Sequence, residues 1–467
     1  MTRKAMRDVI FVLPGITGSV LRKDGEDVWN ASRGTVLRAL LSLGRNVRAL
    51  ELKDDPPDVD DLGDGVTAPS LIQDAHLIPG FWKIDGYTKV VEDIKQTFDI
   101  EPGKNFFEFP YDWRRDNRVA ARKLAREGRA RLAEWRARSG AEDAKLILVG
   151  HSMGGLISRY FLECLDGWRD TRVLVTFGTP YRGSLNAIGT LSNGISRKIG
   201  PISIDLSALV RTFTSVYQLL PIYPCYRGDD GKLVRVTETA IPNLDTATAA
   251  RALAFHDEIR AAVEAHEQDD EYRENRYAIR PVVGTLQPTK QSARPAADGV
   301  SLVPSYEGKD YGGDGTVPRV SATPLEVEQE ENAMFASERH ASLQNEDAVL
   351  VQLRGVISGL DIDFGSFRDA FPAIGLALDL EDAYATDEPV RVRVRPEEEP
   401  SDPLVVEAER IDEHGEPMRR TLQRGEDGWH EAELAPLVEG LYRLTAFGTG
   451  AVEPVSDVFL VSSGVEA

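Results

Sequence analysis

One short glycine-flanked motif constrains the fold more than any other part of the sequence. Residues 150–154 read Gly-His-Ser-Met-Gly, between a buried apolar run at 145–149 and an apolar helical pattern at 156–164. In this setting Gly-x-Ser-x-Gly predicts a sharp strand-to-helix turn that exposes a serine hydroxyl, and the glycines avoid steric clash there. The motif alone is a weak signal, because a simple strand-to-helix connection also uses glycine and serine. Its flanks favour Ser152 as a nucleophile.

A serine hydroxyl is a poor nucleophile at neutral pH, so it needs a base within hydrogen-bond reach. Histidine is the usual base, and in this fold the chain order is serine, acid, histidine. Six of the seven histidines lie inside the motif, before it, in charged helical stretches or in the C-terminal region: His76, His151, His256, His266, His414 and His430. His340 follows the serine in a loop directly before the last predicted helix. Elimination therefore favours His340 as general base and acid, against the alternative of an exposed loop histidine.

The acid of such a site must reach the histidine and hold its ring in the useful tautomer. Asp314 lies in the glycine-rich run Gly-Gly-Asp-Gly-Thr-Val-Pro at residues 312–318. Gly-Asp-Gly is also an ordinary turn, and Asp310 is a nearby rival. The pattern of residues leaves the choice between the two carboxylates open.

Acyl chemistry also needs two backbone N–H groups aimed at the oxyanion. Met153, the residue after the serine, is one candidate donor. The other should come from the loop after an early strand, and Val9–Leu13 is an apolar run followed by Pro-Gly-Ile-Thr-Gly at residues 14–18. Ile16 is therefore the second candidate. The alternative is that residues 14–18 form only a tight turn.

Apolar runs and helical patterns alternate through the first three quarters of the chain. Further strands are expected at 106–111, 173–177 and 280–285, and helices at 87–98, 119–138 and 345–357. This alternation implies right-handed crossovers and a doubly wound, mostly parallel sheet, and with the serine turn it predicts an α/β-hydrolase fold. Two regions interrupt the rhythm, 34–64 and 187–225, and are interpreted as lid and cap elements. Residues 286–312 are expected to be rich in loops.

The C-terminal part of the chain has a different character from about residue 362. Residues 390–394 alternate strictly between valine and arginine, and frequent turns separate further short alternating runs. Such a pattern predicts an all-β sandwich of about 100 residues. We therefore divide the chain into an α/β-hydrolase domain, 1–361, and an immunoglobulin-like β-sandwich domain, 366–467.

The composition of the chain limits the classes of partner that it is expected to bind. The formal net charge is -21, which excludes nucleic acid as an expected partner and disfavours simple electrostatic adsorption to an anionic membrane. Cys164 and Cys225 are the only cysteines; they fit no metal-ligand spacing, and we expect free thiols, with a single bridge left open. No cofactor or metal is expected. No apolar segment is long enough for a signal peptide or a membrane span, so we expect a soluble cytoplasmic protein.

Five sites along the chain together resemble the lecithin:cholesterol acyltransferase family, which includes lysosomal and plant phospholipases. Residues 13–19 (Leu-Pro-Gly-Ile-Thr-Gly-Ser) look like its opening signature, and residues 111–114 (Tyr-Asp-Trp-Arg) are similar to a second family segment. Residues 150–155 match its serine motif, residues 313–318 match its acid loop, and His340 stands where its histidine is expected. The resemblance does not cover the last 100 residues.

The resemblance implies several roles. It implies that Asp314 is the acid of a catalytic triad with Ser152 and His340. It also implies that the substrate is a lipid acyl ester, cleaved through an acyl-enzyme on Ser152. Trp113 would lie near the substrate pocket, with a core aromatic as the alternative. The stretches at 34–50 and 187–221 would meet lipid and allow transient membrane contact, against the alternative of a buried cap. Secreted members carry a signal peptide and a disulfide-bonded lid, which this sequence lacks, so bacterial and intracellular plant members are closer in character.

Three functional hypotheses follow from the sequence. The first is a lipase or phospholipase A that is cytoplasmic, with peripheral binding to a membrane left open. Either water or an alcohol would accept the acyl group. The second is a deacylase of a soluble or lipid-anchored ester. The third is a regulatory or binding protein on a hydrolase scaffold, whose C-terminal domain recruits a protein partner; an intact set of Ser152, Asp314 and His340 argues against it.

Overall fold

A computed structural model gives the fold of the chain. It describes residues 3–30, 47–73, 75–78, 82–199, 202–228, 230–326, 333–359, 374–412, 415–425 and 427–463. Part of the predicted lid, residues 34–46, and the predicted domain boundary near residues 361–366 lie outside the described residues.

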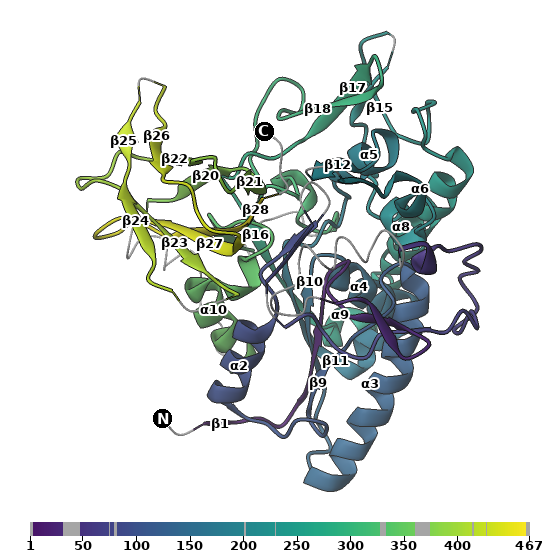
Figure 1. Ribbon diagram of the computed structural model, residues 1–467. Coiled ribbons are helices and arrows are strands. Elements are labelled where there is room, and N and C mark those ends of the chain that lie inside the picture. Colours follow the sequence, from purple (N-terminus) through teal and green to yellow (C-terminus); the bar gives the residue numbers. More distant parts are fainter. Residues whose placement is uncertain are drawn as a thin grey trace.

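A parallel sheet forms the centre of the N-terminal part of the molecule (Figure 1). Its strands lie in the order β19 (Met334–Ala336), β16 (Ala278–Gly284), β11 (Thr171–Phe177), β10 (Leu146–His151), β2 (Val9–Leu13) and β9 (Phe106–Glu108). Every pair in this order is parallel. All residues of β2 and β10 are buried, as expected for continuous apolar strands covered on both faces. The order is that of a doubly wound sheet, with β10 near its centre.

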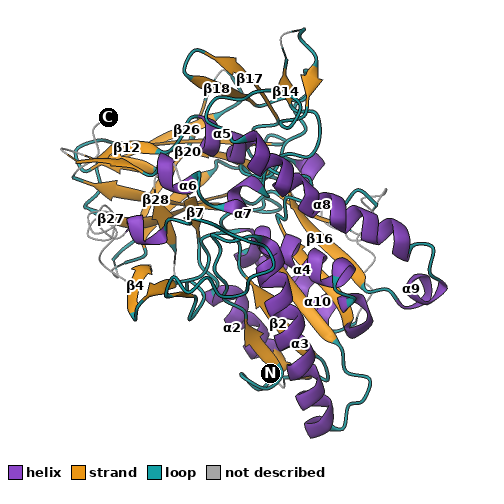
Figure 2. Ribbon diagram, turned by 90° about the vertical axis from the view of Figure 1, so that its right-hand side faces the viewer, coloured by secondary structure: helices purple, strands orange, loops and turns teal. Residues whose placement is uncertain are grey.

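Helices cover both faces of this sheet (Figures 1 and 2). On one side lie α2 (Thr88–Thr97) and α10 (Asp347–Ile357), and on the other lie α3 (Asn117–Ser139), α4 (Met153–Cys164) and α8 (Thr246–His266), with α9 (Asp270–Asn275) following α8. The side chain of Asp116 caps α3 by accepting from the N–H of Arg118, and Gly140 ends it with a φ of 73°. The predicted helices at 87–98, 119–138 and 345–357 are therefore present, within two residues at each end.

The cap region contains more β-structure than the sequence predicts. Between 185 and 217 it has α5 (Leu185–Ser192), a hairpin of β12 (Ser196–Ile199) and β13 (Ile202–Asp205), α6 (Ser207–Val210) and α7 (Thr214–Tyr217). The stretch expected to be rich in loops holds a second hairpin, β17 (Ser292–Ala296) and β18 (Gly299–Val303), so that expectation was wrong in part. With β14 (Tyr226–Arg227) and β15 (Leu233–Val234) it forms a small sheet beside α5. β17 pairs with β18 along its whole length and with β14 at Ala293.

The C-terminal part is a sandwich of two mostly antiparallel sheets, drawn at the left of Figure 1. One sheet has the order β20 (Leu376–Leu380), β22 (Val390–Pro396), β26 (His430–Leu434) and β25 (Gln423–Arg424). The other has the order β21 (Ala383–Ala385), β28 (Val455–Ser462), β27 (Gly440–Phe447), β23 (Val405–Arg410) and β24 (Met418–Thr421). The alternating valines of β22 point into a hydrophobic core that is separate from the core around the parallel sheet.

Short strands complete the N-terminal part. They are β1 (Lys4–Ala5), β3 (Leu21–Lys23), β4 (Glu26–Trp29), β5 (Val66–Thr67), β6 (His76–Ile78), β7 (Trp82–Ile84) and β8 (Phe98–Asp99). None of the helices in the described part of the chain combines the length and apolar character that crossing a bilayer requires.

Candidate active site

Ser152 lies in the turn between β10 and α4, with a backbone conformation that few residues other than glycine adopt. Its φ is 50° and its ψ is −120°. A positive φ in a residue with a side chain costs free energy, and it persists only where the surroundings enforce it. The N–H of Ser152 donates to the carbonyl of Phe177 in the neighbouring strand at 2.8 Å, and the N–H of Gly155 donates to the carbonyl of Ser152 at 3.1 Å. Pairing on both sides of the turn therefore holds the serine in place.

The glycines around Ser152 are required by space. A Cβ on Gly154 would lie 2.7 Å from the carbonyl oxygens of both Leu13 and Pro14, which are backbone atoms of the adjacent strand and loop. A Cβ on Gly155 would overlap the side chain of Thr179, whose hydroxyl donates to the carbonyl of Ser152 at 2.9 Å. Small residues thus allow α4 to start directly against the end of β2.

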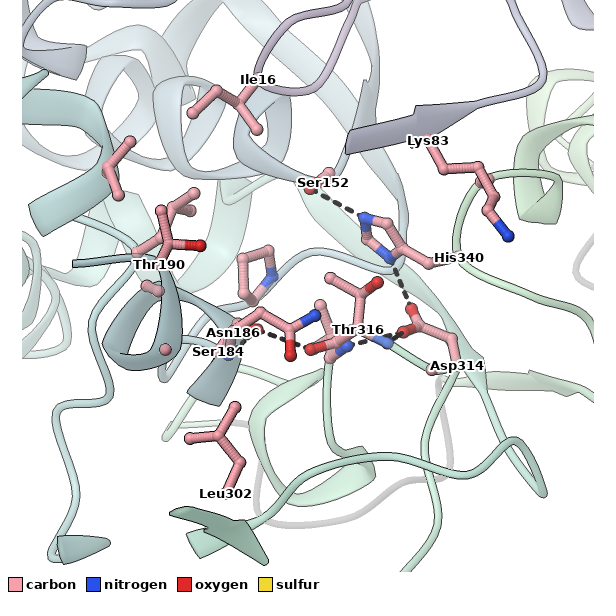
Figure 3. A pocket seen from close by; sticks show the side chains of 18 of the residues that line it. Ile16, Lys83, Ser152, Ser184, Asn186, Thr190, Leu302, Asp314, Thr316 and His340 are labelled. Atoms are coloured by element: carbon pink, nitrogen blue, oxygen red, sulfur yellow. Dashed lines mark hydrogen bonds and ion pairs between the residues drawn. The ribbon is translucent and has the colours of Figure 1, made fainter. Parts of the chain in front are cut away.

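The structure brings the three polar side chains of the predicted triad together (Figure 3). His340 Nε2 lies 3.1 Å from Ser152 Oγ, and His340 Nδ1 lies 2.7 Å from Asp314 Oδ2. All three side chains are buried. Because a carboxylate can only accept, Nδ1–H donates to Asp314, which leaves the lone pair of Nε2 directed at the serine hydroxyl.

Asp314 is fixed by its own loop. Its Oδ1 accepts from the N–H groups of Thr316 at 2.9 Å and Val317 at 2.6 Å, so Oδ2 is left for the histidine. The carbonyl of Asp314 accepts from the N–H of His340 at 2.8 Å, a second link between the two loops. The rival carboxylate, Asp310, accepts from the N–H of Gly312 at 2.8 Å instead. The geometry favours Asp314 over Asp310 as the partner of the histidine.

The loop after β2 lies beside the serine. The N–H of Gly18 donates to the carbonyl of Gly15 at 3.1 Å, which closes a turn around Ile16 and Thr17, and Thr17 has a φ of 59°. Ile16 lines the cavity next to Ser152. Met153 is the first residue of α4, where backbone N–H groups have no acceptor within the helix. Both residues predicted as oxyanion donors therefore flank the serine.

A buried tyrosine and a buried histidine, neither of which was predicted to have a role, connect this loop to the histidine loop. The Tyr87 hydroxyl accepts from the N–H of Gly15 at 2.7 Å and lies 2.9 Å from His151 Nδ1. His151 Nε2 lies 3.1 Å from the carbonyl of His340. Burial, together with the neighbouring His340, lowers the pKa of His151 to about 3. His151 is therefore neutral, donates from Nε2 to the carbonyl of His340 and accepts the Tyr87 O–H at Nδ1. The sequence signal was the histidine inside the serine motif.

The cavity above the triad has a volume of about 560 Å³. One part of its wall is apolar and comes largely from the cap: Ala187, Ile195, Val216, Leu219 and Leu302. Another part is charged: Lys83, Arg339, Asp382 and Asp457. The last two belong to the C-terminal sandwich. No pattern in the sequence pointed to these four residues, because their side chains meet only in the folded chain.

The described residues contain no group of three or more histidine, cysteine, aspartate or glutamate side chains arranged to hold a metal ion. Cys164 and Cys225 are both free thiols. Burial raises the pKa of each thiol, so neither is a reactive thiolate.

A comparison with protein families matches residues 51–277 to the lecithin:cholesterol acyltransferase family. The expected resemblance to that family is confirmed. The matched range contains the Tyr-Asp-Trp-Arg segment and the serine motif, and it ends before Asp314 and His340. By sequence, no curated protein matches the chain.

Comparison with solved structures finds lipases. The mature form of Bacillus licheniformis lipase BlEst2 is 13% identical, covers 75% of this chain and 91% of its own, and has a TM-score of 0.36. Its propeptide form is 11% identical, covers 97% of this chain and 93% of its own, and has a TM-score of 0.32. A soluble variant of monoglyceride lipase from Saccharomyces cerevisiae is 11% identical, covers 77% of this chain and 87% of its own, and has a TM-score of 0.24. Similarity at this level concerns the overall fold alone.

The family's Tyr-Asp-Trp-Arg segment supports the loop after β2. The Tyr111 hydroxyl donates to the carbonyl of Pro14 at 2.7 Å, and Trp113 Nε1 donates to the carbonyl of Ser19 at 3.1 Å. Trp113 is almost fully buried and does not line the described cavity. It packs edge-on against Trp29 and Phe213. The structure therefore places Trp113 in the core behind the loop after β2, the alternative stated from sequence, and not in the wall of the cavity beside Ser152.

The family match and the fold support an ester hydrolase or acyltransferase of the α/β-hydrolase kind. The finer assignment depends on the chemistry of the cavity.

Proposed function

We propose that the protein is a serine hydrolase that cleaves acyl esters of lipids through an acyl-enzyme on Ser152. The observation that carries the proposal is the hydrogen-bonded series from Ser152 Oγ through His340 to Asp314, at 3.1 and 2.7 Å, at the floor of a cavity. Nucleophile, base and orienting acid within hydrogen-bond reach are the requirements for nucleophilic acyl transfer.

The first half of the reaction forms the acyl-enzyme. Ser152 Oγ attacks the ester carbonyl carbon while His340 Nε2 takes the hydroxyl proton. The negative charge on the carbonyl oxygen is stabilised by the N–H groups of Ile16 and Met153. The bond from carbon to the leaving oxygen then breaks, and His340 gives its proton to the leaving alcohol. Asp314 stabilises the imidazolium throughout and does not itself take up the proton.

The second half releases the acyl group. A water molecule or an alcohol attacks the acyl-enzyme, His340 takes its proton, and the bond to Ser152 Oγ breaks with return of that proton to the serine. Water gives a free acid and an alcohol gives a new ester. The acceptor alone therefore decides between hydrolysis and acyl transfer.

Two observations support a lipid as the substrate. Part of the cavity wall is apolar, with Val216, Leu219 and Leu302 among its residues, and an apolar wall suits an acyl chain. The matched family is named for transfer of acyl groups between lipids. A deacylase of a small soluble or lipid-anchored ester is the second candidate, and the charged wall around Lys83 favours it.

A fluorophosphonate probe tests the nucleophile. The wild type should label, and Ser152→Ala should not. Ser158→Ala is a matched control, because Ser158 is a buried serine of α4, the helix that follows Ser152, and its hydroxyl donates to the carbonyl of Gly154. Labelling that persists in Ser152→Ala would show that another residue is the nucleophile.

Turnover of phospholipid and neutral-lipid vesicles, read by mass spectrometry, tests the substrate. We expect greater turnover of long-chain lipid esters than of short p-nitrophenyl esters, with Ser152→Ala as the blank. Greater turnover of the short esters would favour the soluble-ester deacylase. The cytoplasmic location and the transient membrane contact stay predictions, which cell fractionation would test.

A further inference from the structure

The loop that carries His340 is bonded on three consecutive residues to the C-terminal sandwich. The Ser337 hydroxyl donates to Glu453 Oε2 at 3.0 Å. The N–H of Ser456 donates to Glu338, with its nitrogen 3.0 and 3.1 Å from the two carboxylate oxygens. Glu338 is itself almost fully buried. The chain therefore passes the edge of the sandwich immediately before it reaches the histidine.

Arg339 makes the third link, next to His340. Its Nε lies 3.0 Å from Asp457 Oδ2, and its guanidinium also donates to the carbonyl of Leu378 at 3.0 Å. The Asp457 side chain has no exposed surface, and Lys83 Nζ lies 2.9 Å from the same carboxylate oxygen. A buried carboxylate between two cations is held much more firmly than an exposed ion pair, because solvent does not screen it.

The other side of the histidine loop is attached to the sandwich through Asp85. The N–H of Asp85 donates to the carbonyl of Ala341, and the distance is 3.0 Å. The Asp85 carboxylate forms an ion pair with Arg443 of β27. The residues before and after His340 are thus both connected to the sandwich.

The acid loop has a link of its own. Gln287 is buried, and its side-chain amide bonds the backbone of β20 twice, to the carbonyl of Leu376 at 2.8 Å and from the N–H of Leu378 at 3.0 Å. The backbone N–H of Gln287 donates to the carbonyl of Gly313 at 3.0 Å, one residue before Asp314. The same edge of the sandwich therefore reaches both loops of the triad.

We propose that the C-terminal sandwich is a structural part of the catalytic site, which fixes the His340 and Asp314 loops through Asp457 and Gln287 as positioning residues. The inference rests on the proposed function, since it takes His340 as the base. The sandwich also forms the charged wall of the cavity through Asp382 and Asp457. A displacement of about 1 Å at a reacting group costs about 100-fold in rate, so support of these loops from outside the hydrolase core has a direct kinetic consequence.

The variant Asp457→Asn in the full chain tests the proposal. It keeps the volume of the side chain and removes the charge that Arg339 and Lys83 share. We expect kcat for p-nitrophenyl acetate to fall at least about tenfold with little change in KM, because so small an ester does not need the charged wall. Asp427→Asn is the matched control: it breaks an ion pair with Arg393 on the sandwich surface at 2.7 Å and should leave kcat unchanged.

Two measurements separate positioning from activity and from unfolding. Hydrogen exchange of the peptide that covers residues 334–345 should be faster in Asp457→Asn, and the downfield proton resonance of His340 Nδ1–H should weaken. Both report on the loop even if the ester chemistry is different from that proposed. Arg339→Lys, which keeps the cation and loses the two-point contact, is the second variant if Asp457→Asn fails to fold.

Three results would overturn the proposal. The first is a folded Asp457→Asn or Arg339→Lys with unchanged kcat and unchanged exchange. The second is a rise in kcat, which would mean that the contacts with the sandwich slow the reaction. The third is a loss confined to KM for long esters, which would reduce the role of the sandwich to that of a cavity wall.

Discussion

The turn that carries Ser152 is held mainly by neighbouring elements of the parallel sheet. The loop that carries His340 is held by residues from distant parts of the sequence. Ser152 is held by Phe177, by the helix that follows it and by close contact of Gly154 with the end of β2. His340 lies 188 residues later, and its loop is held by Asp85, by the acid loop and by the C-terminal sandwich. One part of the site is built by the parallel sheet, and the other is built where two hydrophobic cores meet.

This difference shows that a short motif can specify a nucleophile while leaving its base to long-range structure. The serine turn is built by β10, α4 and β11, which are consecutive in sequence, and by small residues that let α4 approach the end of β2. The histidine has no such motif, so its position depends on side chains that are remote in sequence. Substitutions around Ser152 (the serine side) and around His340 (the histidine side) should therefore have different effects on activity and stability.

The largest effect is expected on the histidine side. Asp314→Asn should preserve the geometry but stabilise the wrong tautomer of His340, and kcat should fall about 10⁴-fold, as for the equivalent change in serine proteases. Fluorophosphonate labelling should slow in parallel, and hydrogen exchange of α4 should stay the same. Asp310→Asn is the matched control. If both variants keep most of their activity, the acid is elsewhere.

The next effect concerns the serine side. Gly154→Ala adds a Cβ 2.7 Å from two backbone oxygens that cannot rotate away, and it should lower the free energy of unfolding by about 2–3 kcal/mol and reduce labelling of Ser152. Chemical denaturation measures the stability. A Cβ on Gly415 meets nothing within 4 Å, so Gly415→Ala should be close to neutral. Equal stabilities for the two variants would contradict the packing argument.

A smaller effect tests the connection between the two sides. Tyr87→Phe leaves the N–H of Gly15 and His151 Nδ1 without their shared hydroxyl, and we expect a loss of about 1–3 kcal/mol in stability with a lower kcat. Tyr160→Phe removes a tyrosine hydroxyl that donates to the exposed carboxylate of Glu258, and it should cost less. A Tyr87→Phe protein with wild-type kcat would show that the oxyanion loop needs no support from the phenol.

The last effect is a pH dependence, which accumulates gradually across several pH units instead of following from one substitution. The ordinary histidine pKa is 6.5, and burial lowers the pKa of His151 to about 3 in the folded chain. Between these values the unfolded chain binds a proton that the folded chain does not, so acid destabilises the fold, by at most about 1.4 kcal/mol per pH unit for this one group. Stability of the wild type should therefore fall more steeply from pH 6.5 toward 3 than that of His151→Gln. Parallel curves would mean that His151 is protonated in the folded state.

The sheet and the serine turn could be predicted because buried parallel strands are continuous apolar runs, as in β2 and β10. The hairpin of β17 and β18 could not. Its first strand contains Arg294 and Pro295, which break the apolar alternation that marks a strand, although the strand pairs with β18 along its length. The hairpin of β12 and β13 lies in an apolar stretch interpreted from the sequence as a cap, and among the described residues its two strands pair only with each other.

The residues of the candidate site also differ in whether they could be predicted from the sequence. The glycine motif and the order along the chain favoured Ser152 and His340, whereas only the resemblance to the family favoured Asp314 over Asp310. Glu338 and Arg339 look like ordinary surface charges in the sequence, because burial where two hydrophobic cores meet leaves no local pattern. Trp113 shows the opposite case, in which a recognisable segment suggested a pocket residue and the indole supports the loop behind it.

The position of β28 in the chain has a consequence for synthesis. It is the last strand among the described residues, and it carries both Ser456 and Asp457. A ribosome that makes this chain therefore produces the serine, the aspartate and the histidine well before the strand that braces them. If the brace is needed for rate, the nascent hydrolase unit stays slow until β28 has been synthesised and has packed against the His340 loop.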